Sequence, residues 1–302
     1  MKKLIEKINN LKREKNTIIL AHSYQNVEID EVADFVGDSL YLSQKAKETN
    51  AESIIFAGVY FMAQTAKIIS PEKKVLLPNV NAGCLMADMI NLKQIKDFKA
   101  QYPNLPVVCY INSTAEVKAE CDICCTSSNA VEIVKSLNAP KVLFVPDANL
   151  GKYVESQLDG VEVITYSGCC PVHDDVTEKN ILDMRAKYPN AKVLIHPECK
   201  PKISLLGDYI GSTSGIIDYV KNSEDNQFVI VTEKGVVDRL RRDYPEKEFI
   251  LISEKMLCES MKLTTLEEIL YSLENETNEI TLDEEIRKNS ANCIERMLKV
   301  SK

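Results

Sequence analysis

The sequence predicts an α/β fold of three homologous three-layer αβα domains with parallel sheets, related by pseudo-threefold symmetry around a central site. Short β-rich apolar runs alternate with amphipathic helical stretches, a pattern typical of parallel sheets covered by helices on both faces. The pattern also recurs three times. For example, Gln101-Tyr102-Pro103-Asn104 returns as Lys187-Tyr188-Pro189-Asn190, 86 residues later (from 101 to 187).

Each repeat reads helix, strand, helix, strand, helix, strand, cysteine. The expected strands are 17–21, 53–57 and 75–77 in the first repeat, 107–111, 141–145 and 161–165 in the second, and 192–195, 227–231 and 249–252 in the third. After each first strand, a turn of small residues is expected to open a helix, because short polar side chains cap helix N-termini. These turns are Gly37-Asp38-Ser39, Cys125-Thr126-Ser127 and Gly211-Ser212-Thr213.

The repeats set the expected domain boundaries. The first domain is residues 1–88, the second 89–174 and the third 175–262. The tail, residues 263–302, is expected to form helices at 266–273 and 283–300 and to pack back on the first domain.

Composition narrows the class of protein. The net charge of −8 argues against a nucleic-acid binder. No stretch approaches the roughly 20 apolar residues of a membrane helix, and the N-terminus lacks the apolar region of a signal peptide. We therefore expect a cytoplasmic protein with no membrane partner. Its ten cysteines then point to free thiols or metal ligands rather than disulfides.

Polar residues follow the first strand of every repeat. They are His22-Ser23-Tyr24, Tyr110-Ile111-Asn112 and His196-Pro197-Glu198. Ligands of α/β sheets bind beyond the carboxyl ends of the strands. If three domains meet around an axis, these residues converge on one central site. A carboxylate such as Glu198 could serve there as a general base, and Tyr24 and Tyr110 as proton or hydrogen-bond donors.

One cysteine follows the third strand of each repeat: Cys84, Cys170 and Cys258. Three thiolates on a pseudo-threefold axis would hold three irons of a cubane and leave the fourth iron open as a Lewis acid. Other cysteines remain alternatives. Cys121, Cys124 and Cys125 form a CxxC-containing cluster in one repeat only, and Cys169 or Cys199 would be a ligand if the register were shifted by one. Cys109 and Cys293 are interpreted as core residues.

All three histidines of the chain, His22, His173 and His196, fall at repeat-related strand ends or beside a repeat-related cysteine. The turns around Ser127 and around Ser212 and Thr213 add hydroxyls and free backbone N–H groups at helix starts, which bind phosphate or carboxylate. A dianionic substrate is therefore plausible despite the acidic composition.

Ten motifs occur in order between about residues 17 and 270. They are Ala21-His22-Ser23-Tyr24-Gln25, Gly37-Asp38-Ser39-Leu40, Ala82-Gly83-Cys84, Tyr110-Ile111-Asn112, Cys125-Thr126-Ser127-Ser128-Asn129, Pro146-Asp147-Ala148-Asn149-Leu150-Gly151, Gly168-Cys169-Cys170-Pro171-Val172-His173, His196-Pro197-Glu198-Cys199, Gly211-Ser212-Thr213-Ser214 and Thr232-Glu233-Lys234-Gly235. Together they resemble the quinolinate synthase family. Gln64 departs from the family pattern, which commonly has glutamate there.

The resemblance implies three αβα domains around a 4Fe-4S cluster held by Cys84, Cys170 and Cys258. It implies that iminoaspartate condenses with dihydroxyacetone phosphate to give quinolinate, phosphate and water in de novo NAD biosynthesis. It makes Tyr24, His196 and Glu198 the catalytic residues. The expected substrate contacts are His22, Ser39, Tyr110, Ile111, Asn112, Ser127, His173, His196, Pro197, Glu198, Ser212 and Thr213.

Three hypotheses follow. The first is the synthase, with an iminoaspartate-producing enzyme as a candidate partner. The second is another 4Fe-4S hydro-lyase that uses the same open iron on a different hydroxy acid. The third is a non-catalytic iron–sulfur or zinc protein, which would need no ordered substrate-binding hydroxyls.

Overall fold

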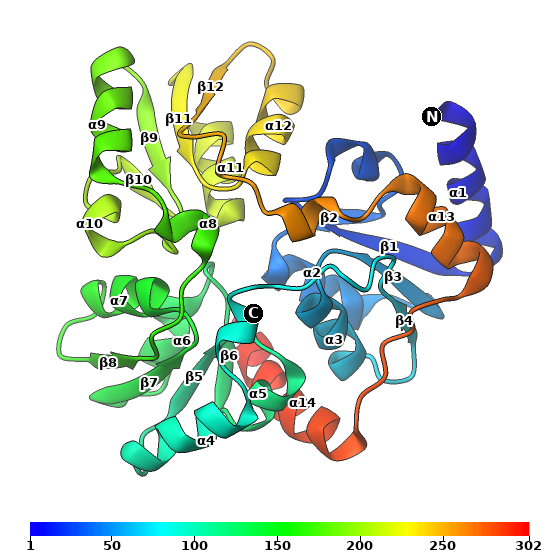
Figure 1. The fold of residues 1–302 in the computed structure, drawn as a ribbon, viewed down its shortest axis with the longest axis horizontal. Coiled ribbons are helices and arrows are strands. Elements are labelled where there is room, and N and C mark those ends of the chain that lie inside the picture. Colours follow the sequence, from blue (N-terminus) through cyan, green and yellow to red (C-terminus); the bar gives the residue numbers. More distant parts are fainter. Residues whose placement is uncertain (302) are drawn as a thin grey trace.

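The computed structural model describes residues 1–301 and contains three four-stranded parallel sheets in that range. The sheets surround a common centre, with helices on both faces of each (Figure 1). Their strand orders are β2-β1-β3-β4, β6-β5-β7-β8 and β10-β9-β11-β12, so all three domains share one topology. The predicted fold class is thereby confirmed.

The strand bounds are β1 Thr17–His22, β2 Phe35–Gly37, β3 Ser53–Ala57, β4 Lys74–Leu76, β5 Val107–Tyr110, β6 Ile123–Cys125, β7 Lys141–Val145, β8 Glu162–Thr165, β9 Lys192–Ile195, β10 Tyr209–Ile210, β11 Gln227–Val231 and β12 Glu248–Leu251. The nine predicted strands all form, with ends shifted by at most one residue. The expectation of three strands per repeat is wrong, however, because β2, β6 and β10 add a fourth. These edge strands have two or three residues each, too few for a periodic pattern to reveal. β4 is as short, but its place before a repeat-related cysteine marked it.

Each added strand lies directly before one of the small-residue turns. It pairs with the first strand of its domain, as His22 with Gly37 and Tyr110 with Cys125. The pairing is parallel, so the end of the first strand and the start of the following turn lie side by side. This arrangement brings the polar strand ends and the helix N-termini to the same edge of each sheet.

The helix bounds are α1 Lys2–Glu14, α2 Ser39–Glu48, α3 Tyr60–Ile69, α4 Leu92–Gln101, α5 Ala115–Ala119, α6 Ala130–Ser136, α7 Ala148–Ser156, α8 Pro171–Asp174, α9 Glu178–Lys187, α10 Pro201–Ser204, α11 Thr213–Asn222, α12 Lys234–Asp243, α13 Leu266–Asn275 and α14 Glu284–Val300. Two of the predicted turns open helices directly, whereas the third, Cys125-Thr126-Ser127, ends two residues before Asn129, the N-cap of α6. Asp38 caps α2 by accepting a hydrogen bond from the backbone N–H of Tyr41, and Ser212 caps α11 through Gly215. Such caps satisfy N–H groups that the helix leaves unpaired.

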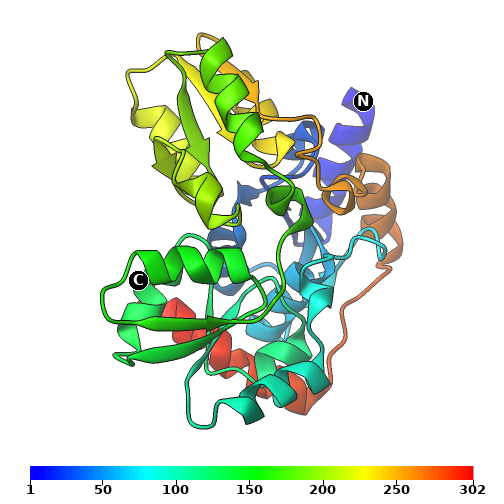
Figure 2. The ribbon, with the colours of Figure 1, turned by 60° about the vertical axis from the view of Figure 1, so that its left-hand side comes forward.

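The tail packs differently from the prediction. Helix α13 lies against α1 and β3 of the first domain, as expected. Helix α14 instead packs mainly on α5 and β6 of the second domain, and also on α3 of the first (Figures 1 and 2). Its apolar face, with Cys293 and Met297, completes a core that the first two domains share. Lys302, the last residue of the predicted tail, lies outside the described residues.

The third domain has its own apolar cores on the two faces of its sheet. It meets the first domain through Tyr24, which packs against one of these cores, and through polar contacts. The buried Arg239 of α12 donates to the carbonyl oxygens of Ser23 and Gln25 and pairs with Asp30, which also binds Arg242 at 2.7 Å.

The domain boundaries at residues 88, 174 and 262 stay a prediction, although each sheet lies within one of the three ranges. Among the helices of residues 1–301, none has the length and apolarity to cross a membrane.

Candidate active site

A cavity of about 540 Å³ lies where the three domains meet. The predicted site residues that line it are His22, Tyr24, Ser39, Cys84, Tyr110, Asn112, Ser127, Cys170, His173, His196, Glu198, Thr213 and Cys258. Ile111, Pro197 and Ser212 are buried nearby but do not line the cavity. Ile111 packs in the core shared by the first two domains, and the hydroxyl of Ser212 is taken up by its helix cap.

The central strands of the three sheets point their carboxyl ends at this cavity. His22 ends β1, Tyr110 ends β5, and His196 directly follows β9. Because the domains share one topology, equivalent positions converge. The same geometry brings the starts of α2 and α11, with Ser39 and Thr213, to the cavity wall.

Glu198 is the centre of a buried hydrogen-bond network. The Tyr110 hydroxyl donates to its Oε1 at 2.6 Å, and His173 Nδ1 lies 2.8 Å from its Oε2. His173 stacks on His196 with ring centroids 4.7 Å apart. Burial by itself would raise the pKa of Glu198, but the two histidines and the Tyr110 hydrogen bond outweigh it and lower that pKa below its ordinary value. Glu198 is therefore an ionised carboxylate at neutral pH, able to accept a proton.

The histidines at the strand ends share one arrangement. The backbone N–H of Tyr24 donates to Nδ1 of His22 at 3.1 Å, and that of Glu198 donates to Nδ1 of His196 at 3.3 Å. A ring nitrogen that accepts carries no proton, so the proton of the neutral ring is on Nε2. Burial lowers the pKa of His22 to about 4 and that of His196 to about 3, so both rings are neutral at pH 7. Each can donate one hydrogen bond from Nε2.

The lowered pKa of His22 predicts a pH-dependent stability. The unfolded chain binds a proton at His22 below pH 6.5, whereas the folded chain does so only near pH 4. Lowering the pH from 7 to 5 should therefore decrease the free energy of unfolding by about 2 kcal/mol, because the unfolded chain takes up a proton at His22 and the folded chain does not. Guanidinium unfolding at the two pH values measures it. His22→Gln, which cannot titrate, should lose this part of the pH dependence, and equal slopes in the two proteins would contradict the assignment.

Two phenols reach the network from different domains. The Tyr24 hydroxyl accepts a hydrogen bond from Thr213 Oγ1 at 3.1 Å and lies 3.0 Å from Thr232 Oγ1. Burial and the nearby Glu198 charge raise the pKa of Tyr24 and of Tyr110 well above the ordinary value. Both tyrosines therefore keep their protons at neutral pH and act as hydrogen-bond or proton donors.

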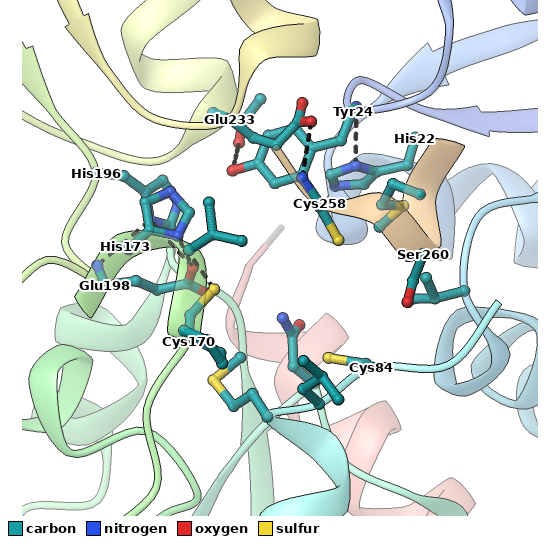
Figure 3. Close-up of a pocket in the computed structure, with 18 of the residues that line it drawn as sticks. His22, Tyr24, Cys84, Cys170, His173, His196, Glu198, Glu233, Cys258 and Ser260 are labelled. Atoms are coloured by element: carbon teal, nitrogen blue, oxygen red, sulfur yellow. Dashed lines mark hydrogen bonds and ion pairs between the residues drawn. The ribbon is translucent and has the colours of Figure 1, made fainter. Parts of the chain in front are cut away.

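Cys84, Cys170 and Cys258 approach the cavity from three sides, one from each domain, and their sulfur atoms point toward a common space (Figure 3). Burial raises the pKa of all three thiols, that of Cys84 to about 12. Three buried thiols become thiolates only when a cation compensates their charge. This donor set fits an iron–sulfur cluster, whose thiolate ligands bind different irons.

A second set of ligand atoms lies beside Cys170. Among the residues that the structure describes, the group of three His, Cys, Asp or Glu ligand atoms within 4.8 Å of one another is Cys170, His173 and Glu198. These atoms could hold a single ion. All three residues line the same cavity as Cys84 and Cys258.

The alternative cysteine ligands lie elsewhere. Cys121, Cys124 and Cys125 are buried in the core of the second domain, where Cys124 Sγ is 3.2 Å from Cys293 Sγ. Cys169 and Cys199 do not line the cavity either. Gln64, the departure from the family pattern, accepts a hydrogen bond from the Ala115 N–H at the start of α5 and is also away from the cavity.

Sequence reasoning missed a pair of charged residues that connects two parts of the site. The buried Glu233 accepts a hydrogen bond from the Cys258 N–H at 3.2 Å and pairs with Lys262 at 3.2 Å. Lys262 in turn donates to the carbonyl oxygen of Tyr24. The pair thereby ties the Cys258 segment to the Tyr24 segment. The available signal was the position of Glu233, two residues after the end of β11. The buried Asp147 stands at the same position after β7 in the second domain, whereas the first domain has Val59 there.

Comparison with known proteins supports the resemblance. The family model described as quinolinate synthetase A protein matches residues 6–299. A quinolinate synthase of Alkaliphilus metalliredigens is 50% identical over 297 residues, which cover 98% of each chain. One of Dehalococcoides mccartyi is 50% identical over 98% of this chain and 97% of its own, and one of Clostridioides difficile is 47% identical over 99% of both. These full-length matches agree with the three repeated αβα domains and with the central cavity to which each domain contributes one cysteine. The chain belongs to the quinolinate synthetase A family.

Proposed function

We propose that this protein is a quinolinate synthase of NAD biosynthesis. It condenses iminoaspartate with dihydroxyacetone phosphate and releases quinolinate, phosphate and two waters. One observation carries the proposal: three cysteines from three domains share a cavity with the Glu198 network and the Tyr24 hydroxyl. A redox or structural metal site would not require that set of ordered proton donors and acceptors.

Cys84, Cys170 and Cys258 are the residues that would hold a 4Fe-4S cluster. Three protein thiolates leave one iron without a protein ligand, and the bound cluster would supply a Lewis acid for a substrate oxygen. Glu233 supports this part of the cavity through its hydrogen bond from the Cys258 N–H.

The substrates bring two carboxylates and one phosphate, and the cavity offers neutral or positive partners for them. Ser39 and Thr213 begin α2 and α11, where unpaired N–H groups and the helix dipole favour anions. His22 and His196 add Nε2–H donors. These local groups explain how a chain with a net charge of −8 could bind anionic substrates.

The proton-transfer roles follow from the protonation states. Ring formation removes protons from carbon and nitrogen and releases two hydroxyls as water. Glu198, held ionised, accepts a proton at a carboxylate oxygen, and His196 stacks on its partner His173 to hold the network in place. Tyr24 is protonated at neutral pH because burial and the Glu198 charge raise its pKa, so its hydroxyl is the group available to hydrogen-bond or protonate a departing hydroxyl.

The cellular setting is part of the proposal. All ten cysteines are free, which fits the reducing cytoplasm. Iminoaspartate is an imine that water hydrolyses, so an enzyme that produces it is the expected partner. Transfer between the two would shorten its exposure to solvent.

The direct test is an assay of anaerobically purified, cluster-reconstituted protein with dihydroxyacetone phosphate and freshly generated iminoaspartate. Quinolinate detected by mass spectrometry, and absent when either substrate is omitted, supports the proposal. A cluster-loaded protein that makes none would overturn the substrate assignment. In that case profiling on hydroxy acids would test the hydro-lyase hypothesis, which the open-iron architecture equally allows.

A further inference from the structure

The three small-residue turns at the cavity differ at two repeat-related positions. Asp38 of the first domain corresponds to Thr126 and Ser212, which follow at intervals of 88 and 86 residues (38 to 126 to 212). Two residues further on, the second and third domains have Ser128 and Ser214. The first domain has Leu40 there, which cannot form hydrogen bonds.

These differences meet at one carboxylate group. Asp38 Oδ2 accepts hydrogen bonds from Ser128 Oγ and from Ser214 Oγ, both at 2.7 Å. Its Oδ1 accepts the N–H of Tyr41 in its own domain at 3.0 Å. Asp38 is 7% exposed and lines the cavity. A single side chain therefore joins the helix-start turns of all three domains.

A carboxylate suits this position better than the hydroxyls found in the other two domains. The single hydroxyl oxygen of Ser212 already accepts the capping hydrogen bond of α11. A carboxylate has a second oxygen, which can accept two further hydrogen bonds. Hydrogen bonds to an ionised acceptor are also stronger than those between neutral groups. The symmetry is thus broken so that one domain accepts and the other two donate.

We infer that Asp38 is a positioning residue that sets the spacing of the three turns that carry Ser39, Ser127 and Thr213. Asp38 and the two serines that it binds are each adjacent to a predicted substrate contact: Asp38 to Ser39, Ser128 to Ser127, and Ser214 to Thr213. Asp38 cannot itself contact an anion favourably, so its contribution is to geometry. The identity of the anions rests on the proposed function.

The test compares the affinity of cluster-loaded protein for quinolinate in the parent and in Asp38→Asn, by calorimetry. A purely electrostatic role and a positioning role of Asp38 predict opposite changes in quinolinate affinity. Removing a negative charge beside a dianion would by itself tighten binding, whereas loosening the three turns should weaken it. We expect about tenfold weaker binding, since hydrogen bonds to a charged group are lost. The KM values for the substrates should rise more than kcat falls.

The serines provide the conservative variants. Ser128→Ala and Ser214→Ala should each weaken quinolinate binding by about threefold and change no charge. Adding both to Asp38→Asn should weaken binding no further, because all three changes remove the same interaction. Asp34→Asn is the matched control. Asp34 accepts a hydrogen bond from the Ile19 N–H in the same domain but does not line the cavity, so quinolinate affinity should be unchanged.

Unchanged or tighter binding by Asp38→Asn, or serine effects that persist in that background, would overturn the inference. Failure of the proposed function looks different, because the parent protein itself would then not bind quinolinate. The hydrogen bonds from Ser128 and Ser214 to Asp38 can in that case be tested by thermal unfolding, which needs no ligand. Asp38→Asn and the double serine variant should then lower the midpoint by similar amounts, and their combination should lower it no further.

Discussion

Replacing Cys84, Cys170 or Cys258 by serine is expected to abolish both quinolinate formation and the visible absorption of an intact 4Fe-4S cluster. Each cysteine is the contribution of one domain, so no neighbouring thiol at the cavity can substitute for it. A serine hydroxyl is a poor ligand for iron in such clusters, which are held by thiolates. Iron and labile sulfide content, measured on anaerobically reconstituted protein, should fall with the activity.

Cys293→Ser is the matched control. Cys293 of α14 is buried beside Cys124 in the core that the first two domains share, and it does not line the cavity. It should keep its iron and sulfide content and its activity, apart from a modest loss of stability. The prediction would be wrong if the triple variant at Cys84, Cys170 and Cys258 retained a full cluster. Loss of the cluster in Cys121→Ser or Cys124→Ser would instead favour the CxxC-containing alternative.

Glu198→Gln is expected to lower kcat by about 10²- to 10⁴-fold while the cluster and the fold are retained, since general-base catalysis contributes this much. Glutamine has nearly the same shape and can still accept the hydrogen bond from Tyr110, but it cannot take up a proton. Steady-state kinetics give kcat and KM, and cluster absorption and far-ultraviolet circular dichroism report on integrity. The change should appear mainly in kcat, because Glu198 is assigned to a chemical step.

Two comparisons sharpen this prediction. Tyr110→Phe removes the 2.6 Å hydrogen bond to Glu198 without removing the base, so it should cost less than Glu198→Gln. Glu155→Gln changes a carboxylate on α7 whose partners are Lys152 and the Val163 N–H, outside the cavity, and should leave kcat unchanged. A kcat for Glu198→Gln within about twofold of the parent would rule out Glu198 as the base.

The repeat places chemically different groups at equivalent positions around one cavity. Equivalent positions carry His22, Tyr110 and His196 at the strand ends, and Tyr24, Asn112 and Glu198 two residues later. In both sets the first and second residues are 88 positions apart, and the second and third are 86 positions apart. A strictly threefold site would present the same group three times and could not distinguish an acid from a base. Divergence at equivalent positions gives one cavity a phenol, an amide and a carboxylate.

The sequence by itself determined the parts of this protein that depend on local pattern. Apolar runs that alternate with helical stretches predicted nine of the twelve strands found in residues 1–301, and the repeat predicted that strand ends and one cysteine per domain share an edge of each sheet. These signals are local, because residues on one strand or helix face follow its period. The cysteines, Tyr24 and Glu198 could therefore be selected before any contact between them was visible.

Only the tertiary structure decided which of these residues meet. The Tyr110–Glu198 hydrogen bond and the Lys262–Tyr24 contact each join two domains. The hydrogen bonds at Asp38 join all three. The short edge strands and the packing of α14 on the second domain likewise depend on neighbours distant in sequence. Such contacts follow from how whole domains and helices pack against one another. That packing is set by many buried side chains together, and no local period in the chain records it.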